Sequence, residues 1–221
     1  YTTGSLTTSN DSDSYYCAVS YGGTSINSNS VSTKIKPYII SQPSNLIVNN
    51  ATGPYSFQVT VGGSGSIYYQ WYKGATALGT SYQHVINPAY LSDAGVYYCK
   101  VTSSYDSTGL NSSNVSLYIN PYITSQPSST IQYAGYYAVF SVAAQGSGTL
   151  SYQWYRNGSI ISGATSSSHA EYTTSSSNGY TFYCIVSSNV GGTSSVQSST
   201  ATLTAVWIPT YATYDGDQTT Y

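Results

Sequence analysis

The sequence predicts an all-β chain built from tandem β-sandwiches, and three observations support this. A Tyr-Gln-Trp-Tyr run at 69–72 is followed by an Asp-x-Gly-x-Tyr-x-Cys run that ends at Cys99. The same combination recurs with Trp154 and Cys184, and no window of useful length has a helical period. A buried Trp and a Cys at this spacing suit the core of a sandwich. We expect indole and thiol to meet there from facing sheets.

Period-two alternation predicts which side chains of these strands point inward. Residues 56–61 and 139–143 alternate apolar and polar side chains and end in glycine-rich turns, as strands do. Tyr15 and Tyr97 stand two residues before a Cys, where a buried hydroxyl can bond to upstream backbone, whereas Phe182 lacks that hydroxyl. The predicted core signature is Tyr15, Cys17, Trp71, Tyr97, Cys99, Trp154, Phe182 and Cys184.

Two nearly identical octapeptides divide the chain. Pro-Tyr-Ile-Ile-Ser-Gln-Pro-Ser occupies 37–44, and Pro-Tyr-Ile-Thr-Ser-Gln-Pro-Ser occupies 121–128. Self-similarity over this length marks an array of whole domains. We predict a partial domain at 1–36, complete domains at 37–120 and 121–206, and a tail, following domain or docking arm at 207–221. Each Pro stiffens its joint, so the array is expected to be extended.

These motifs resemble the immunoglobulin-like (Ig-like) superfamily. The matching features are Tyr-Gln-Trp-Tyr-Lys/Arg with a following Gly, the Tyr-Tyr-Cys or Phe-Tyr-Cys end, and the Ser-Gln-Pro-Ser opening. They are most similar to the disulfide-less Ig-like repeats of prokaryotic cell-surface proteins. The resemblance covers residues 37–206 fully and 1–36 in part. It implies Greek-key sandwiches in an extracellular stalk, adhesin, surface layer or filament.

On this resemblance, residues 1–36 supply only strands E, F and G, at 1–6, 14–20 and 31–35. Three strands with one apolar face cannot bury that face themselves. Either the sequence is a window from a longer tandem array, or another subunit donates the missing strands. Because Tyr1 does not open a signal peptide, we expect a piece of a longer exported precursor.

The three cysteines occupy one position of the repeat. In antibody-like domains the partner Cys lies on strand B, where this chain has Val59 and Val142. We therefore predict that Cys17, Cys99 and Cys184 are buried free thiols. An intermolecular disulfide or a metal site is the alternative interpretation.

The composition excludes several classes of partner. Charged residues make up 5% of the 221 residues, the formal net charge is −2, and 27 residues are Tyr. This gives no electrostatic footprint for nucleic acid or an anionic membrane. No apolar run approaches the length of a membrane span.

Catalytic chemistry has few candidates, and we expect no enzyme, cofactor or metal. His84 and His169 are equivalent repeat positions, and Glu171 is the single Glu. Neither a catalytic nor a phosphate-binding motif is present. The acidic pairs Asp11/Asp13 and Asp215/Asp217 fit turns better than calcium sites. An isopeptide crosslink from Lys34, Lys73 or Lys100 would need a buried acid that the motif lacks.

Two surface features point to partners. By alternation, Tyr72, Tyr98, Tyr155 and Tyr183 form an outward stripe suited to packing against a subunit or neighbouring domain, carbohydrate stacking or cross-strand pairing. Glycan would supply the solvation that charge does not. The N-glycosylation motifs lie at Asn10, Asn50, Asn111, Asn114 and Asn157.

Two functions remain, and they belong to different classes. The first is a structural extracellular protein that builds a filament, stalk or coat by packing with copies of itself, which low charge favours. The second is a surface adhesin that binds glycan or protein. A role as accessory domain of a secreted enzyme would require a catalytic region elsewhere in the gene.

Overall fold

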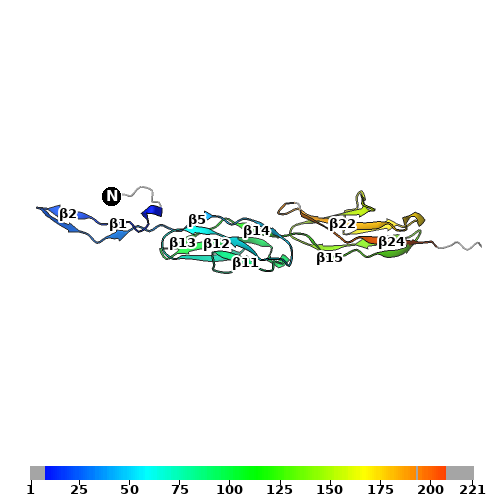
Figure 1. The fold of residues 1–221 in the computed structure, drawn as a ribbon, viewed down its shortest axis with the longest axis horizontal. Coiled ribbons are helices and arrows are strands. Elements are labelled where there is room, and N and C mark those ends of the chain that lie inside the picture. The colour runs from blue at the N-terminus through cyan, green and yellow to red at the C-terminus, as the bar shows by residue number, and fades with distance from the viewer. Residues whose placement is uncertain (1–7, 193, 208–221) are drawn as a thin grey trace, which may run out of the picture. The chain divides into compact units, whose positions relative to one another are not determined.

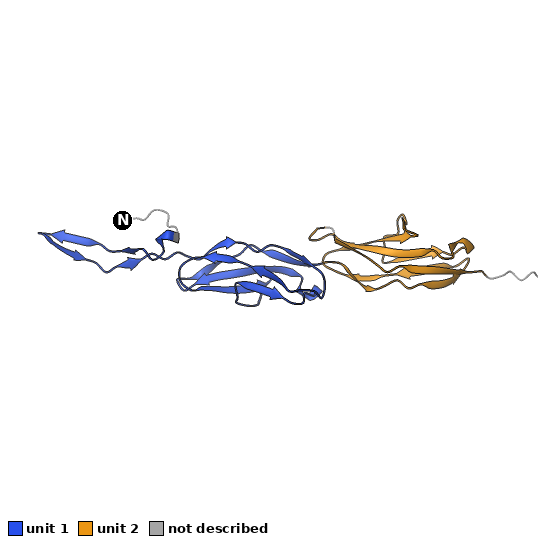
Figure 2. Cartoon of the chain, in the orientation of Figure 1, with its two compact units in different colours: residues 1–119 blue, residues 120–221 orange. Residues whose placement is uncertain are grey.

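The computed structural model describes residues 8–192 and 194–207. The chain divides into two compact units, residues 1–119 and 120–221, shown in blue and orange in Figure 2. Almost all regular structure in the described residues is strand, and the helical segments η1 (Thr8–Asn10), η2 (Leu91–Asp93) and η3 (Ser175–Ser177) are single 3₁₀ turns. The all-β prediction is confirmed.

The second repeat forms a complete sandwich within the first unit (Figure 1). One sheet has the order β10-β9-β12-β14-β6, with β13 also on β12, and the pairs β5–β8 and β7–β11 form the other side. Strand β6 runs parallel to β14, and the other pairs are antiparallel. The strands are β5 (Tyr38–Ser41), β6 (Leu46–Val48), β7 (Tyr55–Gln58), β8 (Thr60–Gly62), β9 (Ile67–Lys73), β10 (Thr76–Ala77), β11 (Gln83–Ile86), β12 (Gly95–Ser103), β13 (Asp106–Asn111) and β14 (Val115–Ile119).

The core of this repeat forms where the alternation predicts it. Every second residue of β12 from Tyr97 to Ser103 is buried, and Trp71 is fully buried opposite Cys99. Trp71 and Cys99 are cross-strand neighbours in one sheet, so the expectation that they come from facing sheets is wrong. The facing sheet contributes Phe57 instead, whose ring lies 4.9 Å from that of Tyr97.

The third repeat folds in the same way within residues 120–221. Its larger sheet has the order β16-β24-β22-β19-β20 with β23 on β22, and the pairs β15–β18 and β17–β21 complete the sandwich. Phe140 and Phe182 stack in the core, beside the buried Trp154 and Cys184. The strands are β15 (Tyr122–Ser125), β16 (Thr130–Tyr133), β17 (Tyr137–Ser141), β18 (Ala143–Gln145), β19 (Leu150–Arg156), β20 (Ser159–Ile160), β21 (Ser168–Tyr172), β22 (Thr181–Ser188), β23 (Ser194–Gln197) and β24 (Ala201–Val206).

The N-terminal segment is a long hairpin, here called the N-terminal hairpin (residues 14–32). Strand β1 (Ser14–Tyr15) pairs with β4 (Val31–Ser32), and β2 (Ala18–Tyr21) pairs with β3 (Thr24–Asn27). Gly22 and Gly23 form its tip with φ of +56° and +85°. Two consecutive positive φ angles match the right-handed twist of the flanking strands, and glycine adopts them without steric cost.

Burial of Cys17 is not found. Cys99 and Cys184 are buried free thiols, but Cys17 is exposed, and Tyr15 is only half-buried. Among the described residues β2 pairs with β3 alone, and every residue of these two strands is exposed, so the face that carries Cys17 is uncovered there. The strand expected at residues 1–6, Asp215, Asp217 and nearly all of the tail at 207–221 fall outside the described residues.

Candidate interaction surface

The N-terminal hairpin repeats the F–G strand pair of the complete domains, register for register. Tyr15 lies opposite Val31 and Val19 opposite Ile26 in the hairpin. In the second repeat Tyr97 lies opposite Val115 and Val101 opposite Leu110. The hairpin therefore presents Tyr15, Val19 and Val31 at the positions of Tyr97, Val101 and Val115, which belong to the core of the second repeat.

A serine hydroxyl fixes this geometry in all three repeats. The backbone N–H of Cys17 donates to Ser28 Oγ at 2.9 Å, and Ser28 N–H donates back to Cys17 O at 2.8 Å. Ser112 does the same for Cys99, and Ser198 does the same for Cys184. The sequence analysis missed these serines, although each stands in a Ser-rich run shortly after its Cys. Within the described residues, the hairpin thus has the same local geometry as the corresponding strand pair of a complete domain.

Exposure separates the hairpin from its counterparts. Val19, Ile26 and Val31 are 66%, 73% and 67% exposed, whereas Val101 and Val115 are 0% and 4% exposed. Val19 and Ile26 face each other across the ladder, and alternation places Tyr15, Cys17 and Tyr21 on the same face. These six side chains, Tyr15, Cys17, Val19, Tyr21, Ile26 and Val31, are here called the hairpin face.

In the part of the chain that the structure describes, β2 has no strand partner on the edge where its counterpart β12 has one. Strand β12 pairs with β9 from Tyr97 to Ser103 and with β13 and β14 on its other side. Among the described residues, β2 pairs with β3 alone. Unpaired strand edges present N–H and C=O groups that can accept another strand. The hairpin thus combines an open apolar face with an open edge.

A polar joint ties the base of the hairpin to the second repeat. Ser64, which is buried, donates its backbone N–H to Ile35 O at 2.8 Å. Its hydroxyl accepts from Ile35 N–H at 2.6 Å and donates to the Asp11 carboxylate. Asp11 is thereby placed in a structural turn, as the sequence predicts.

Two lysines add to this joint. Lys34 Nζ lies 5.2 Å from the centre of the Tyr105 ring, and Lys36 Nζ lies 3.6 Å from Asp106 Oδ2. The N–H groups of Gly109 and Thr108, together with Lys36, hold the pKa of Asp106 below its ordinary value. The carboxylate therefore stays ionised through the neutral range. Nothing in the sequence marks Ser64 or Asp106 as members of this contact.

The buried thiols are poorly suited to nucleophilic reactions or metal binding. Burial raises the pKa of Cys99 to about 11, and it also raises the pKa of Cys184. The thiolate is the reactive form of cysteine, so both side chains behave as small apolar groups at neutral pH. Tyr97 Oη donates to Asp93 O at 2.6 Å, as the sequence predicts, and Phe182 occupies the equivalent position in the third repeat.

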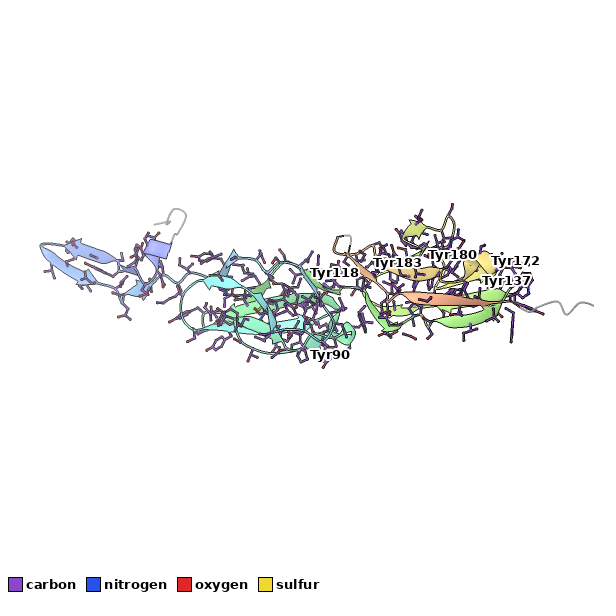
Figure 3. The ribbon with its side chains drawn as sticks, turned by 45° about the vertical axis from the view of Figure 1, so that its right-hand side comes forward. Tyr90, Tyr118, Tyr137, Tyr172, Tyr180 and Tyr183 are labelled. Atoms are coloured by element: carbon purple, nitrogen blue, oxygen red, sulfur yellow. The ribbon has the colours of Figure 1, made fainter. Side chains whose placement is uncertain are left out.

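The four predicted outward tyrosines form two stacked pairs. Tyr72 and Tyr98 lie directly opposite on β9 and β12, with ring centres 4.9 Å apart and planes 11° apart. Tyr155 and Tyr183 repeat this on β19 and β22 at 4.9 Å and 5° (Figure 3 labels Tyr183). All four are half-buried, so cross-strand stacking accounts for part of their surface. Their role as an interface stays a prediction.

A second aromatic pair lies on the other sheet of the third repeat. Tyr137 on β17 faces Tyr172 on β21, with ring centres 5.3 Å apart in an edge-to-face arrangement (Figure 3). Both rings are more than half exposed, together with Val139 on the same face. Neither tyrosine lies on a strand that carries the Trp or Cys motif, so no sequence motif marks them as a surface pair.

Titratable groups gather at one place in the second unit. Glu171 Oε1 accepts from Arg156 at 2.6 Å, and Glu171 Oε2 lies 3.1 Å from His169 Nε2. His169 also packs against Trp154 and Phe182, and His84 packs in the same way against Trp71 and Tyr97. Both histidines thus occupy equivalent structural positions. Within residues 8–192 and 194–207, no cluster of three or more His, Cys, Asp or Glu side chains could hold a metal ion.

The Asn side chains of the five glycosylation motifs differ in their hydrogen bonds and in their exposure. Asn10 Nδ2 donates to Asp13, Asn50 Oδ1 accepts from Leu91 N–H, and Asn157 Oδ1 accepts from Thr181 N–H. Asn111, the last residue of β13, and Asn114, in the loop before β14, are exposed. In the described part of the chain, no helix is long and apolar enough to cross a membrane.

Comparison with known proteins identifies the fold. No family model and no curated protein matches the sequence. Among solved structures, three titin domains (I67–I69, Glu-to-Ala variant) are 18% identical, with a TM-score of 0.61 over 88% of this chain and 75% of theirs. The fold is that of tandem Ig-like domains. The four N-terminal Ig domains of Dscam1 are 18% identical, with a TM-score of 0.57 over 91% of this chain and 56% of theirs. Extracellular domains 3–5 of Drosophila OTK are 13% identical, with a TM-score of 0.51 over 88% and 71%.

Proposed function

We propose that this chain is a structural segment of an extracellular Ig-like array, and that it assembles with copies of itself through the N-terminal hairpin. The observation that carries the proposal is the hairpin face, which has the register of a domain core and the exposure of a surface. The likeness to tandem Ig-like structures and the low charge support it. A disulfide-less prokaryotic surface protein is the class that the sequence motifs favour.

Burial of the hairpin face would supply a large driving force. Val19 and Val31 would each contribute at most roughly 1.5–3 kcal/mol if they became as buried as Val101 and Val115, their counterparts in the second repeat. Strand addition along β2 would also satisfy its open edge. Low charge limits the electrostatic repulsion between closely packed copies.

The test is the state of association of the purified chain. We expect light scattering after size exclusion, together with negative-stain images, to show regular polymers rather than separate monomers. Ile26→Asp, which places a charge in the centre of the hairpin face, should abolish them. Ile160→Asp is the matched control, because Ile160 is 62% exposed on β20 of a complete domain. This control should polymerise normally.

Two results would contradict self-assembly. The first is a monomer whose hairpin amides exchange freely with solvent at every protein concentration. The second is a polymer that Ile26→Asp leaves intact.

A surface adhesin is the alternative function. The half-exposed Tyr137, Tyr172 and Val139 face supports it, since aromatic side chains with a polar tip are common in recognition surfaces. A monomeric chain that binds cells or immobilised glycans through this face, with loss on Tyr137→Ser and Tyr172→Ser, would favour that function.

A further inference from the structure

A hollow lies on the outer face of the larger sheet in the second repeat. It is bordered by the Tyr72–Tyr98 stack on β9 and β12 and by residues of β13. Its lining consists of Tyr72, Tyr98, Lys100, Thr108, Gly109, Leu110 and Asn111. A flat aromatic wall beside amide, ammonium and hydroxyl groups suits a sugar ring, which has apolar faces and a polar rim.

The irregular course of β13 opens this hollow. The register between β12 and β13 shifts between Val101 and Ser103, and Gly109 adopts φ of +63° there. A Cβ at Gly109 would lie 2.0 Å from Val101 O, so no other residue fits without moving the strand. The backbone of β12 at Val101 thereby occupies the space that a side chain at position 109 would need.

Asn111 stands at the rim of the hollow, in an acceptor motif for N-glycosylation. Asn111 lies opposite Lys100 on β12, and Tyr98 is the next outward residue of that strand. Diagonal neighbours in an antiparallel pair are about 7–8 Å apart. The first sugar on Asn111 Nδ2 therefore begins within reach of the Tyr98 ring.

We propose that Asn111 carries an N-linked glycan and that the innermost sugar ring packs in this hollow against Tyr98. The chemical class of the occupant is a neutral hexose or N-acetylhexosamine. The proposal is independent of self-assembly, since it concerns an outer face of a complete domain. It also gives the Tyr72–Tyr98 stack a partner besides its own two rings.

The attachment is a group transfer with a defined balance. The Asn111 side-chain nitrogen attacks the anomeric carbon of an oligosaccharide that a lipid diphosphate carries. The new N–C bond forms while the bond from that carbon to the phosphate oxygen breaks. The lipid diphosphate leaves with the electron pair, and the amide loses one proton to a base of the transferring enzyme.

Geometry favours Asn111 over Asn10 and Asn157. Asn10 donates its own Nδ2 to Asp13, and that nitrogen is the atom that a glycan would use. Asn157 holds a left-handed turn with φ of +48°. Ser113 supplies the hydroxyl of the motif from an exposed position, while its N–H donates to Gln42 Oε1. Asn111 combines exposure, an intact motif and an adjacent aromatic wall.

The third repeat provides an internal control. Gln197 lies opposite Ile185 in the position of Asn111, beside the Tyr155–Tyr183 stack. Ser198 and Ser199 follow it, with the same hydrogen bonds to Cys184 and Gln126 that Ser112 and Ser113 make to Cys99 and Gln42. One substitution, Gln197→Asn, therefore creates an equivalent motif on an equivalent scaffold.

The experiment uses the full chain secreted from cells that perform N-glycosylation, with glycopeptide mass spectrometry. We expect glycan on Asn111 in the natural chain, its loss in Ser113→Ala, and a new glycan at position 197 in Gln197→Asn. An unmodified Asn111 in protein that carries glycan at other motifs would overturn the proposal.

A second readout separates packing from mere attachment. We expect nuclear Overhauser contacts between the innermost sugar and the Tyr98 ring. Glycan removal should lower the melting temperature of the natural chain by a few degrees but leave that of Tyr98→Ala unchanged. Glycan on Asn111 without contacts to Tyr98 would refute packing. Binding of the free oligosaccharide to a natural chain whose Asn111 is unmodified would show that the hollow takes sugar from solution, and would refute an attached occupant.

Discussion

Three cysteines at one position of the repeat occupy two environments. Cys99 and Cys184 are buried against an opposing sheet, whereas Cys17 lies on the open hairpin face. A residue pattern specifies the face of a strand on which a side chain lies. Whether that face is covered depends on elements elsewhere, so the pattern alone gave the right face and the wrong burial for Cys17.

Thiol labelling should report this difference directly. At pH 8 an alkylating reagent should modify Cys17 within minutes in the unassembled chain, while Cys99 and Cys184 react only on unfolding, because burial raises the pKa of both. Mass spectrometry of the labelled peptides measures this. Protection of Cys17 in the polymer would follow from a covered hairpin face, and equal labelling of all three thiols would contradict the described cores.

Tyr97 makes the second repeat sensitive to alkali. Burial raises the pKa of Tyr97 to about 12 from 10.0, so the folded state favours the neutral phenol. Its contribution to stability is complete below pH 10 and is lost as the pH rises from 10 to 12. Tyr97→Phe should lower the free energy of unfolding by about 1 kcal/mol at pH 7, through the lost bond to Asp93 O.

The same variant should lose less stability between pH 10 and 12 than the natural chain does. Urea titrations at pH 7, 10 and 12 measure both effects. Tyr68→Phe is the control, because Tyr68 is 55% exposed on β9. An identical alkaline decline in Tyr97→Phe and the natural chain would contradict the assignment.

At the scale of elements, the position of β13 beside β12 depends on a single glycine, Gly109. Gly74 and Gly109 both adopt left-handed backbone, with φ of +55° and +63°. A Cβ at Gly74 would meet nothing within 4 Å, whereas a Cβ at Gly109 would collide with the carbonyl of Val101. Substitutions at Gly74 and Gly109 can therefore be compared. The first measures the conformational cost of a left-handed residue with a Cβ, and the second adds the cost of a steric clash.

Alanine at the two sites should have unequal effects. Gly74→Ala should destabilise the second repeat by about 1–2 kcal/mol, the cost of left-handed backbone for a residue with a Cβ. Gly109→Ala should cost clearly more and should increase amide exchange in β13, because the strand must move away from Val101. Equal losses from the two variants in urea unfolding would contradict this account.

For the whole molecule, two compact units imply two cores that fail separately. Leu117 and Leu203 are both fully buried, one in each unit. Leu117→Ala should destabilise the first unit by about 2–5 kcal/mol through lost contacts and a cavity, and leave the second unchanged. Leu203→Ala should do the reverse. Hydrogen exchange is measured peptide by peptide at increasing urea concentrations. It distinguishes a loss of stability in one unit from a loss shared by both units.

Much of this architecture could be predicted from sequence because the driving pattern is local. Alternation around Trp71, Cys99, Trp154 and Cys184 gave the strands and their inner faces correctly. The joint at Ser64 could not be predicted, since its partners Ile35 and Asp11 are distant in sequence and carry no motif. The hollow at Asn111 depends on a register shift and on Gly109, which alternation does not encode.

The open hairpin face has a thermodynamic corollary. If its cover comes from another molecule, folding of that segment and association are one equilibrium, and the law of mass action applies. The melting temperature of residues 14–32 would then rise as the protein concentration rises. The melting temperatures of the two complete sandwiches would not depend on protein concentration.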